Sequence, residues 1–279
     1  MKSIHTKFVL VMLVALSVCT LTIGGISLST AKESIDKDAV QLMSFLCGKQ
    51  AQELNNTLGR IEQSVDILAD YAMKELINIE DITSDSEYLE KYTEKMNDLA
   101  STIVDKSAGA YSIYMRFNPE ICPPTSGFFK LINFETGEFE NLPPVDISSY
   151  DPEDVEHVGW FYIPMQEGHA VWMKPYYSQN TNIDLISYVV PMYKDDIMIG
   201  VVGMDIDYSF IKQTVDDISL YFTGYAYLTD SDLNTIYNKK NEIKVASDYW
   251  ESLTVARDLE ENGVDTLYGY YGENEEYDE

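Results

Sequence analysis

The sequence contains few of the residues on which many exported and catalytic proteins depend. Its 279 residues include only 3 cysteines and 3 histidines. Cys19 lies in the first apolar run, which leaves Cys47 and Cys122 for the rest of the chain. These numbers exclude a disulfide-rich scaffold, and no cysteine or histidine cluster has the spacing of a zinc site. One Cys47–Cys122 disulfide and two free thiols are the alternatives, of which we expect the second.

Positive charge is also scarce. The chain has 19 Lys and Arg residues against 47 Asp and Glu residues, a formal net charge of -28. Such a surface repels nucleic acids and anionic lipid headgroups. We therefore expect no nucleic acid partner, and the charge agrees with a soluble exported domain or with cationic ligands.

Common catalytic and nucleotide-binding motifs are missing from the sequence. It contains no GxSxG, HExxH, GxxxxGK[ST] or GxGxxG motif. We therefore predict that the chain is not an enzyme and has no catalytic residue, no metal site and no cofactor. An exported hydrolase with two acting carboxylates is the least favoured alternative, since so many acidic residues always include pairs.

The first long segment without charge indicates a membrane anchor. Residues 8–28 contain no charged residue over 21 positions, which at about 1.5 Å per residue spans roughly 30 Å of hydrocarbon. Lys2 and Lys7 precede it, so the positive-inside rule places residues 1–7 in the cytoplasm and the bulk of the chain outside the cell membrane. The alternative is a signal peptide cleaved near residues 29–31, but the apolar run is long for one.

A heptad pattern predicts one long helix over residues 33–80. Its apolar positions recur every seven residues, at Val40, Cys47, Leu54, Ile61 and Leu68. Two interpretations remain open. The helix pairs with a second copy in a homodimer, with Cys47 in the seam, or its apolar stripe packs on its own domain.

The remaining periodicity predicts an α+β fold. We expect a helix over 85–106, a loop over 143–157 and a helix over 207–218. Strands are expected at 110–117, 128–134, 138–142, 171–174, 185–192 and 197–206, with a further hairpin of 225–228 and 234–237. This divides the chain into a distal module, residues 81–222, and an incomplete second α+β unit, residues 223–279, which is expected to be truncated.

Several segments in this order resemble the double Cache extracytoplasmic sensor domains of bacterial signal transducers. Along the chain they are 111–119, 126–129, Trp160, Trp172, Pro175-Tyr176, Ser187-Tyr188 and 200–206. The resemblance covers about residues 33–240. It implies a long N-terminal helix packed on a PAS-like antiparallel sheet, with a ligand pocket in the distal module.

The resemblance also implies which residues bind a ligand. In the amino-acid-binding branch, an arginine two residues before a tryptophan holds the ligand carboxylate, and a tyrosine and an aspartate hold its amino group. Here the tryptophan, tyrosine and aspartate are Trp160, Tyr176 and Asp205, but Val158 stands at the arginine position. The implied ligand has an amine and no α-carboxylate, or is of a different kind.

Other residues near these positions complete the expected ligand site. We include Trp172, Tyr188 and Tyr162, because aromatic faces bind small cations. Arg116 lies in the middle of an apolar strand. It forms an internal ion pair, or it reaches the pocket in place of the missing arginine.

These expectations together predict a membrane-anchored sensor of a small molecule. The signal would pass through a helical homodimer to a cytoplasmic output domain that this chain lacks, such as a diguanylate cyclase, a histidine kinase or a chemotaxis receptor. The main alternative is a stand-alone anchored solute-binding or adhesion protein of the cell envelope.

Overall fold

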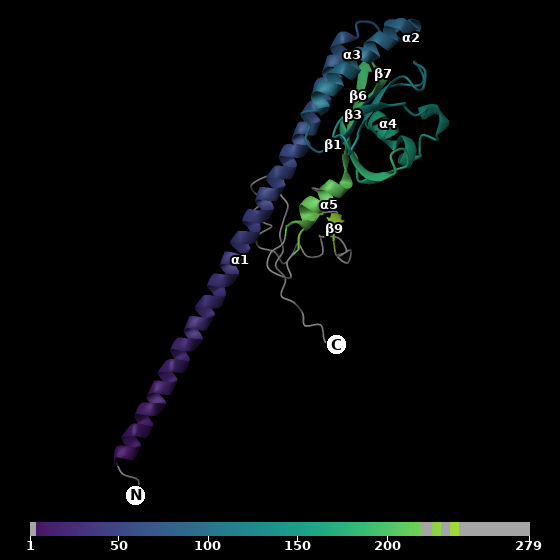
Figure 1. The fold of residues 1–279 in the computed structure, drawn as a ribbon. Coiled ribbons are helices and arrows are strands. Elements are labelled where there is room, and N and C mark those ends of the chain that lie inside the picture. The colour runs from purple at the N-terminus through teal and green to yellow at the C-terminus, as the bar shows by residue number, and fades with distance from the viewer. Residues whose placement is uncertain (1–3, 219–224, 230–234, 240–279) are drawn as a thin grey trace.

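A computed structural model describes residues 4–218, 225–229 and 235–239. Figure 1 shows a long helix that carries an α+β module at the end far from the N-terminus. The helices are α1 (Ile4–Glu75), α2 (Ile79–Ser84), α3 (Ser86–Val104), the 3-10 helix η1 (Ile147–Ser149), α4 (Val155–Glu167) and α5 (Tyr208–Asp216). The strands are β1 (Ala110–Phe117), β2 (Gly127–Ile132), β3 (Phe139–Leu142), β4 (Val171–Trp172), β5 (Tyr176–Ser178), β6 (Ile183–Lys194), β7 (Ile197–Asp207), β8 (Tyr227–Thr229) and β9 (Thr235–Asn238).

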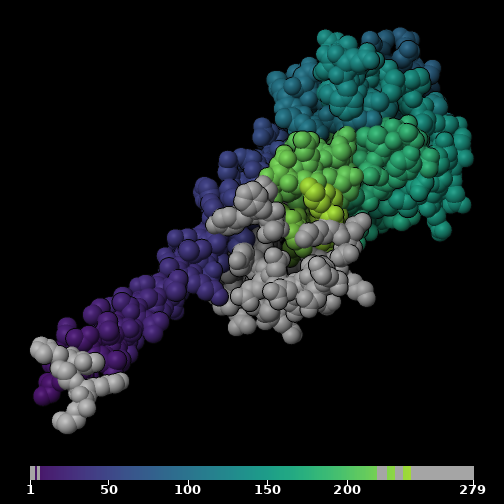
Figure 2. All heavy atoms as spheres, turned by 60° about the horizontal axis from the view of Figure 1, so that its bottom comes forward, coloured from purple at the N-terminus to yellow at the C-terminus, as the bar shows by residue number. Residues whose placement is uncertain are grey.

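Helix α1 joins the expected anchor and the expected long helix without a break. It has 72 residues, which corresponds to roughly 108 Å at 1.5 Å per residue. Its most apolar window has a mean hydropathy of 2.5 and is 0% buried, so the helix is long and apolar enough to cross a membrane by length and composition. Figure 2 shows this N-terminal part, in purple, projecting away from the body of the protein.

The heptad stripe of α1 packs within the chain from Cys47 onward. Cys47 and Leu54 are 3% and 6% exposed and belong to a cluster with residues of α5. Ile61 and Leu68 are fully buried in the main core. Val40, one heptad before Cys47, is 37% exposed. Packing on its own domain, the second of the two interpretations, therefore describes these turns, and the expected place for Cys47 in a dimer seam is not observed.

Seven antiparallel strands form the main sheet, in the order β3-β2-β1-β7-β6-β4, with β5 also paired to β6. The longest pair is β6 and β7, a hairpin whose turn contains Asp195 and Asp196 at φ values of 49° and 63°. The long helix and the antiparallel sheet together confirm the predicted α+β class.

The two faces of the sheet are covered by different helices. On one face, Met115, Met204 and Tyr188 pack with α1 and α3 in the main core. On the other face, Tyr114 and Val189 pack with α4. Successive residues of a strand point to opposite faces, so β1 is buried at every position because both faces are covered. This second face, under α4, holds the cavity described below.

Aspartate N-caps fix where three helices begin. Asp85 accepts hydrogen bonds from two backbone N–H groups at the start of α3, and Asp154 and Asp207 each accept one at the starts of α4 and α5. Such caps satisfy N–H groups that have no partner inside the helix. Helix α4 is a correction to the sequence analysis, which expected a loop up to residue 157 and assigned no helix after it.

The second unit is described only in part. Strands β8 and β9 form a two-stranded sheet close to the expected hairpin. Tyr208 of α5 donates a hydrogen bond of 2.5 Å to the Ile236 carbonyl and so ties this hairpin to the module. Residues 240–279, which carry most of the expected unit at 223–279, lie outside the described residues.

The two cysteines beyond the apolar run are free thiols. Cys47 and Cys122 are both buried, and they lie in separate clusters. Burial raises the pKa of each thiol to about 11. The Cys47–Cys122 disulfide is therefore excluded.

The close approach of β1 and β7 generates a test of the fold. A Cβ at Gly200 would collide with the Arg116 carbonyl oxygen and would lie 2.9 Å from the Phe117 Cα. Both are backbone atoms, so the paired strands would have to move apart to accommodate it. We expect Gly200→Ala to lower the free energy of unfolding by about 1–3 kcal/mol. The matched control is Gly59→Ala in α1, where nothing lies within 4 Å, and which should raise it by about 0.5–1 kcal/mol.

Urea unfolding of the full chain in detergent micelles, followed by circular dichroism, measures both changes. Equal stability of the Gly200→Ala variant and the wild type would contradict the strand pairing described here.

Candidate ligand-binding site

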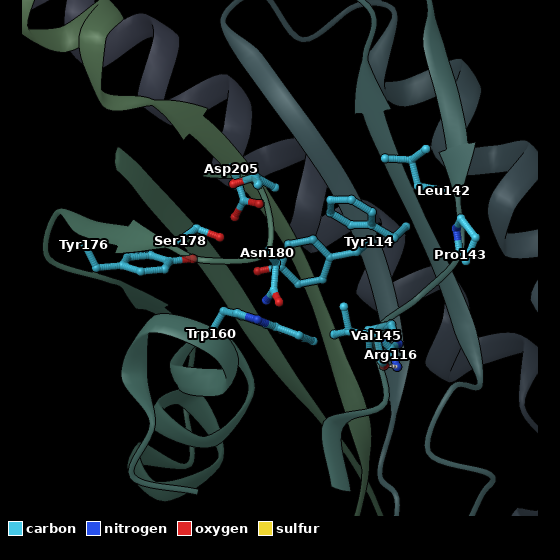
Figure 3. A pocket seen from close by; sticks show the side chains of 12 residues that line it. Tyr114, Arg116, Leu142, Pro143, Val145, Trp160, Tyr176, Ser178, Asn180 and Asp205 are labelled. Carbon is cyan, nitrogen blue, oxygen red and sulfur yellow. Dashed lines mark hydrogen bonds between the residues drawn. The ribbon is translucent and has the colours of Figure 1, made fainter. Parts of the chain in front are cut away.

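A cavity of about 120 Å³ lies between the sheet and α4. Its size suits a ligand of about six to eight non-hydrogen atoms, since a cavity of similar volume holds benzene. Aromatic and aliphatic side chains form much of its wall, and polar groups stand at defined points (Figure 3). The polar and charged residues that line it are Tyr114, Arg116, Tyr176, Ser178, Asn180, Thr181 and Asp205.

Asp205 is the buried carboxylate of this cavity. Strand register places Ser112 of β1 and Ser187 of β6 directly opposite Asp205 of β7, one on each side. Both serine hydroxyls donate to the carboxylate, Ser187 at 2.6 Å. The residue is 4% exposed, and burial raises its pKa to about 6 although the hydroxyl donors oppose the shift. A cation that entered the cavity would favour the ionised form.

Two tyrosines extend the network around Asp205. The Tyr176 hydroxyl lies 3.0 Å from the Ser187 hydroxyl, and burial together with the nearby carboxylate raises the pKa of Tyr176. The ring of Tyr114 crosses β7 at Gly203, where any Cβ would collide with it. The buried Tyr114 hydroxyl lies close to Asp205 and Ser187, and both act on its pKa, but it forms no hydrogen bond of good geometry with any described residue. An unpaired buried hydroxyl is costly, so a bound polar group would stabilise it.

Trp160 forms the opposite wall. It lies on α4, and its indole N–H donates to the His157 carbonyl at 2.8 Å, which fixes the ring. The ring meets Tyr114 edge-on, with centroids 5.0 Å apart. Because the indole N–H is used within the helix, Trp160 offers its aromatic face rather than a hydrogen bond.

Arg116 lies at the end of the cavity opposite Asp205 (Figure 3). Its guanidinium stands over the Trp160 ring, 5.8 Å from the centroid. It is 2% exposed, and burial lowers its pKa to about 10. Of the two earlier alternatives for Arg116, an internal ion pair is not observed among the described residues.

Three expected site residues lie away from this cavity. Trp172 and Tyr188 face α1, where the indole donates to Glu62 at 2.6 Å and the Tyr188 hydroxyl donates to Asp66 at 3.2 Å. Tyr162 is half-buried on α4 beside Phe161. The structure thus brings together Trp160, Tyr176, Asp205 and Arg116, but not these three.

Val158, at the position where the resemblance expects an arginine, is fully buried in the core under α4. It does not line the cavity.

Several polar residues of the site were not predicted from the sequence. Ser187 belongs to it through the register of β6 with β7, which the sequence does not specify. Asn180 and Ser178 follow from the short strand β5, which was not expected. The alternation in 110–117 does place Ser112, Tyr114 and Arg116 on one face, and this signal could have found them.

The buried carboxylate makes stability depend on pH in a defined direction. Because the folded pKa of Asp205 is about 6 and its ordinary value is 3.8, its protonated form stabilises the fold below about pH 4. That contribution, about 3 kcal/mol, is lost as pH rises through 6. We expect Asp205→Asn to become more stable relative to wild type between pH 4 and pH 7.

Urea unfolding of the full chain at pH 4, 5 and 7 measures this difference. Asp98→Asn, at an exposed acidic residue on α3, is the control and should show a much smaller change. A constant difference between Asp205→Asn and wild type over this range would show that Asp205 does not titrate as a buried carboxylate.

Comparison of this sequence with known protein families gives one match. Residues 96–213 match the family model described as methyl-accepting chemotaxis protein-like, first PDC sensor domain. Among curated proteins, none matches the sequence significantly.

Solved structures show the same fold. The sensory domain of the Campylobacter jejuni chemoreceptor Tlp3 with isoleucine bound is similar at 16% identity and a TM-score of 0.51, over 79% of this chain and 81% of that one. The extracellular domain of soHK1S-Z6, a protein assigned as a histidine kinase, is similar at 18% identity and a TM-score of 0.50, over 66% of each chain. Residues 96–213 are therefore similar to a Cache (PDC) type sensor domain, and the chain shares the fold of these solved structures.

Proposed function

We propose that this protein is a membrane-anchored extracytoplasmic sensor that binds a small, amine-bearing ligand between Trp160, Tyr176 and Asp205. The observation that carries the proposal is Asp205, a buried carboxylate at the wall of a small aromatic cavity. A buried carboxylate without a cation is costly at neutral pH, and a ligand ammonium would compensate it.

The aromatic walls support a cationic ligand. Ring faces of tryptophan and tyrosine attract cations through their quadrupoles, and Trp160, Tyr114 and Tyr176 line the cavity. Val158 supplies no positive charge at the position that would hold an α-carboxylate. We therefore propose an amine rather than an α-amino acid as the ligand.

Contacts on the opposite face of the sheet support transmission to α1. Neighbouring residues of β6 point to opposite faces, so Ser187 contacts Asp205 while Tyr188 contacts Asp66 of α1. Trp172, paired with Tyr188, contacts Glu62 one turn away. A shift of β6 on ligand binding would move these contacts, and α1 continues from them to its apolar segment.

The signal would then pass to a second copy and to an output domain. We propose that α1 contributes to a homodimer through the exposed face of its turns before Cys47, where Ile35, Leu42 and Phe45 are exposed. In this proposal the N-terminus is cytoplasmic, and the output domain is of the cyclase, histidine kinase or chemoreceptor type.

A hydrolase receives no support from this cavity. Among the described residues that line it, Asp205 is the single carboxylate. Two-carboxylate hydrolysis requires a second acid within about 5–10 Å across the reacting bond.

The ligand class is tested by thermal unfolding of the full chain in detergent micelles, read by intrinsic fluorescence. Small primary amines at about 100 times their Kd should stabilise the protein by about 2.7 kcal/mol, which raises Tm by several degrees. The α-amino acids that correspond to these amines should give a smaller shift or none. Equal shifts from both series would contradict an amine-specific pocket, and no shift from any amine would contradict the proposed function.

The affinity for amines should also depend on pH and should weaken as the pH falls below about 6. The ammonium pairs with ionised Asp205, whose pKa of about 6 means that ligand and proton compete. We expect Kd to rise about tenfold per pH unit well below pH 6 and to level off above pH 7, because alkylamines stay protonated throughout. Calorimetric titration from pH 4.5 to 8 measures this, and the Asp205→Asn variant should show weak binding without the pH dependence. Tighter binding at low pH would rule out Asp205 as the partner of the ammonium.

A further inference from the structure

The buried guanidinium of Arg116 is satisfied by backbone carbonyl groups alone. Its Nε donates to the Ser126 carbonyl at 3.2 Å, and Nη2 donates to the carbonyls of Pro124 and Val145 at 2.8 and 2.7 Å. None of these three bonds uses Nη1. The carbonyls hold the guanidinium in place at the cavity wall and leave its positive charge without a carboxylate in contact.

Nearby acidic residues do not neutralise this charge. Within the part of the chain that the structure describes, no ion pair involves Arg116. The carboxylate of Asp146 attracts the guanidinium electrostatically without contacting it. This carboxylate accepts a hydrogen bond from the Ser148 hydroxyl. Removing a charge from water without an opposite charge costs several kcal/mol, so the site is electrostatically incomplete at this end.

The backbone positions of Asp205 and Arg116 are far apart compared with the length of an α-amino acid. Asp205 is opposite Ser112 of β1, and Arg116 lies four residues further along that strand, opposite Val201. Four residues correspond to about 13 Å along a strand. Figure 3 shows Tyr114 between the two charged side chains. The amine nitrogen and carboxyl carbon of an α-amino acid are separated by about 2.5 Å.

We propose that Arg116 binds an anionic group of the ligand, and that the ligand is a short linear ω-amino acid with its ammonium at Asp205 and its carboxylate at Arg116. This inference rests on the proposed binding of an amine at Asp205. The aliphatic part of such a ligand lies along Trp160 and Tyr114, and the carboxylate accepts from the Nη1 amino group. Arg116 thus binds the ligand carboxylate, which Val158 cannot do, and it does so farther from the ammonium site at Asp205.

Cavity size limits the length of this ligand. A volume of about 120 Å³ admits about six to eight non-hydrogen atoms. Three or four methylene groups fit this volume and place the ammonium and the carboxyl carbon about 5–6 Å apart. The reach of the Asp205 and Arg116 side chains covers the rest of the separation between their backbone positions. Compounds with one methylene group reach only one of the two charged residues.

The test compares matched ligands by calorimetric titration of the wild-type full chain in detergent micelles. The first pair is 5-aminopentanoate and n-butylamine, which have the same four methylene or methyl carbons after the amine and differ in the carboxylate. The second comparison is the series glycine, β-alanine, 4-aminobutyrate and 5-aminopentanoate. We expect 5-aminopentanoate to bind at least tenfold more tightly than n-butylamine, and affinity to rise along the series.

A variant assigns this difference to Arg116. In Arg116→Gln, the affinity for 5-aminopentanoate should fall to that for n-butylamine, while the affinity for n-butylamine should stay unchanged or improve. Lys130→Gln is the matched control, because Lys130 is another buried cation of the sheet, 6% exposed, that does not line the cavity. It should change neither affinity.

The possible outcomes separate the two proposals. If n-butylamine binds and 5-aminopentanoate binds no more tightly, the role of Arg116 is wrong and the proposed amine sensor stands. If glycine binds as tightly as 5-aminopentanoate, the predicted separation of charges is wrong. If no compound of either series binds, both proposals are wrong. The wild-type comparison decides these points even if Arg116→Gln fails to fold.

Discussion

The burial of the Asp205 carboxylate in the middle of a β-sheet is the constraint on which the rest of the site depends. A carboxylate there must be supplied with donors, and the register of three adjacent strands places one serine on each side of it. The ring of Tyr114 lies on the same face, directly over Gly203, and any side chain at position 203 would collide with it. Helix α4 then closes the cavity with Trp160. Strand pairing therefore builds the part of the pocket around Asp205, and loop residues such as Val145 and Asn180 complete its wall.

The sheet connects this pocket to the long helix because each strand has two faces. Ser187 and Tyr188 are consecutive in β6, yet one contacts the cavity network and the other contacts α1. The main core on the α1 side is apolar and extensive, so the hydrogen bonds to Glu62 and Asp66 are polar contacts within a packed interface. Small changes of β6 can shift such contacts more readily than they can reorganise a close-packed core.

Much of the fold could be predicted from the sequence, and the site only in part. Period-two and apolar segments predicted β1, β6 and β7, and the heptads predicted α1, because these patterns follow directly from burial in the core. The resemblance to Cache sensors predicted Trp160, Tyr176 and Asp205, which the structure brings together. Helix α4 was missed, because its acidic start looks like a loop and Pro164 interrupts its helical pattern. Trp172 and Tyr188 were expected in the pocket, but both side chains lie on the face of the sheet that packs on α1. Which face a strand residue occupies depends on the register with the neighbouring strand.

The most direct test of this view of the site is an NMR titration of the Asp205 carboxyl carbon in the aspartate-labelled full chain, assigned with Asp205→Asn. Without ligand, the carboxyl should titrate with a pKa of about 6. With saturating n-butylamine, the pKa should fall by at least one unit, because the bound ammonium stabilises the ionised form. A pKa near 4 in the free protein, or one that saturating amine leaves unchanged, would contradict a buried carboxylate that binds the ligand cation.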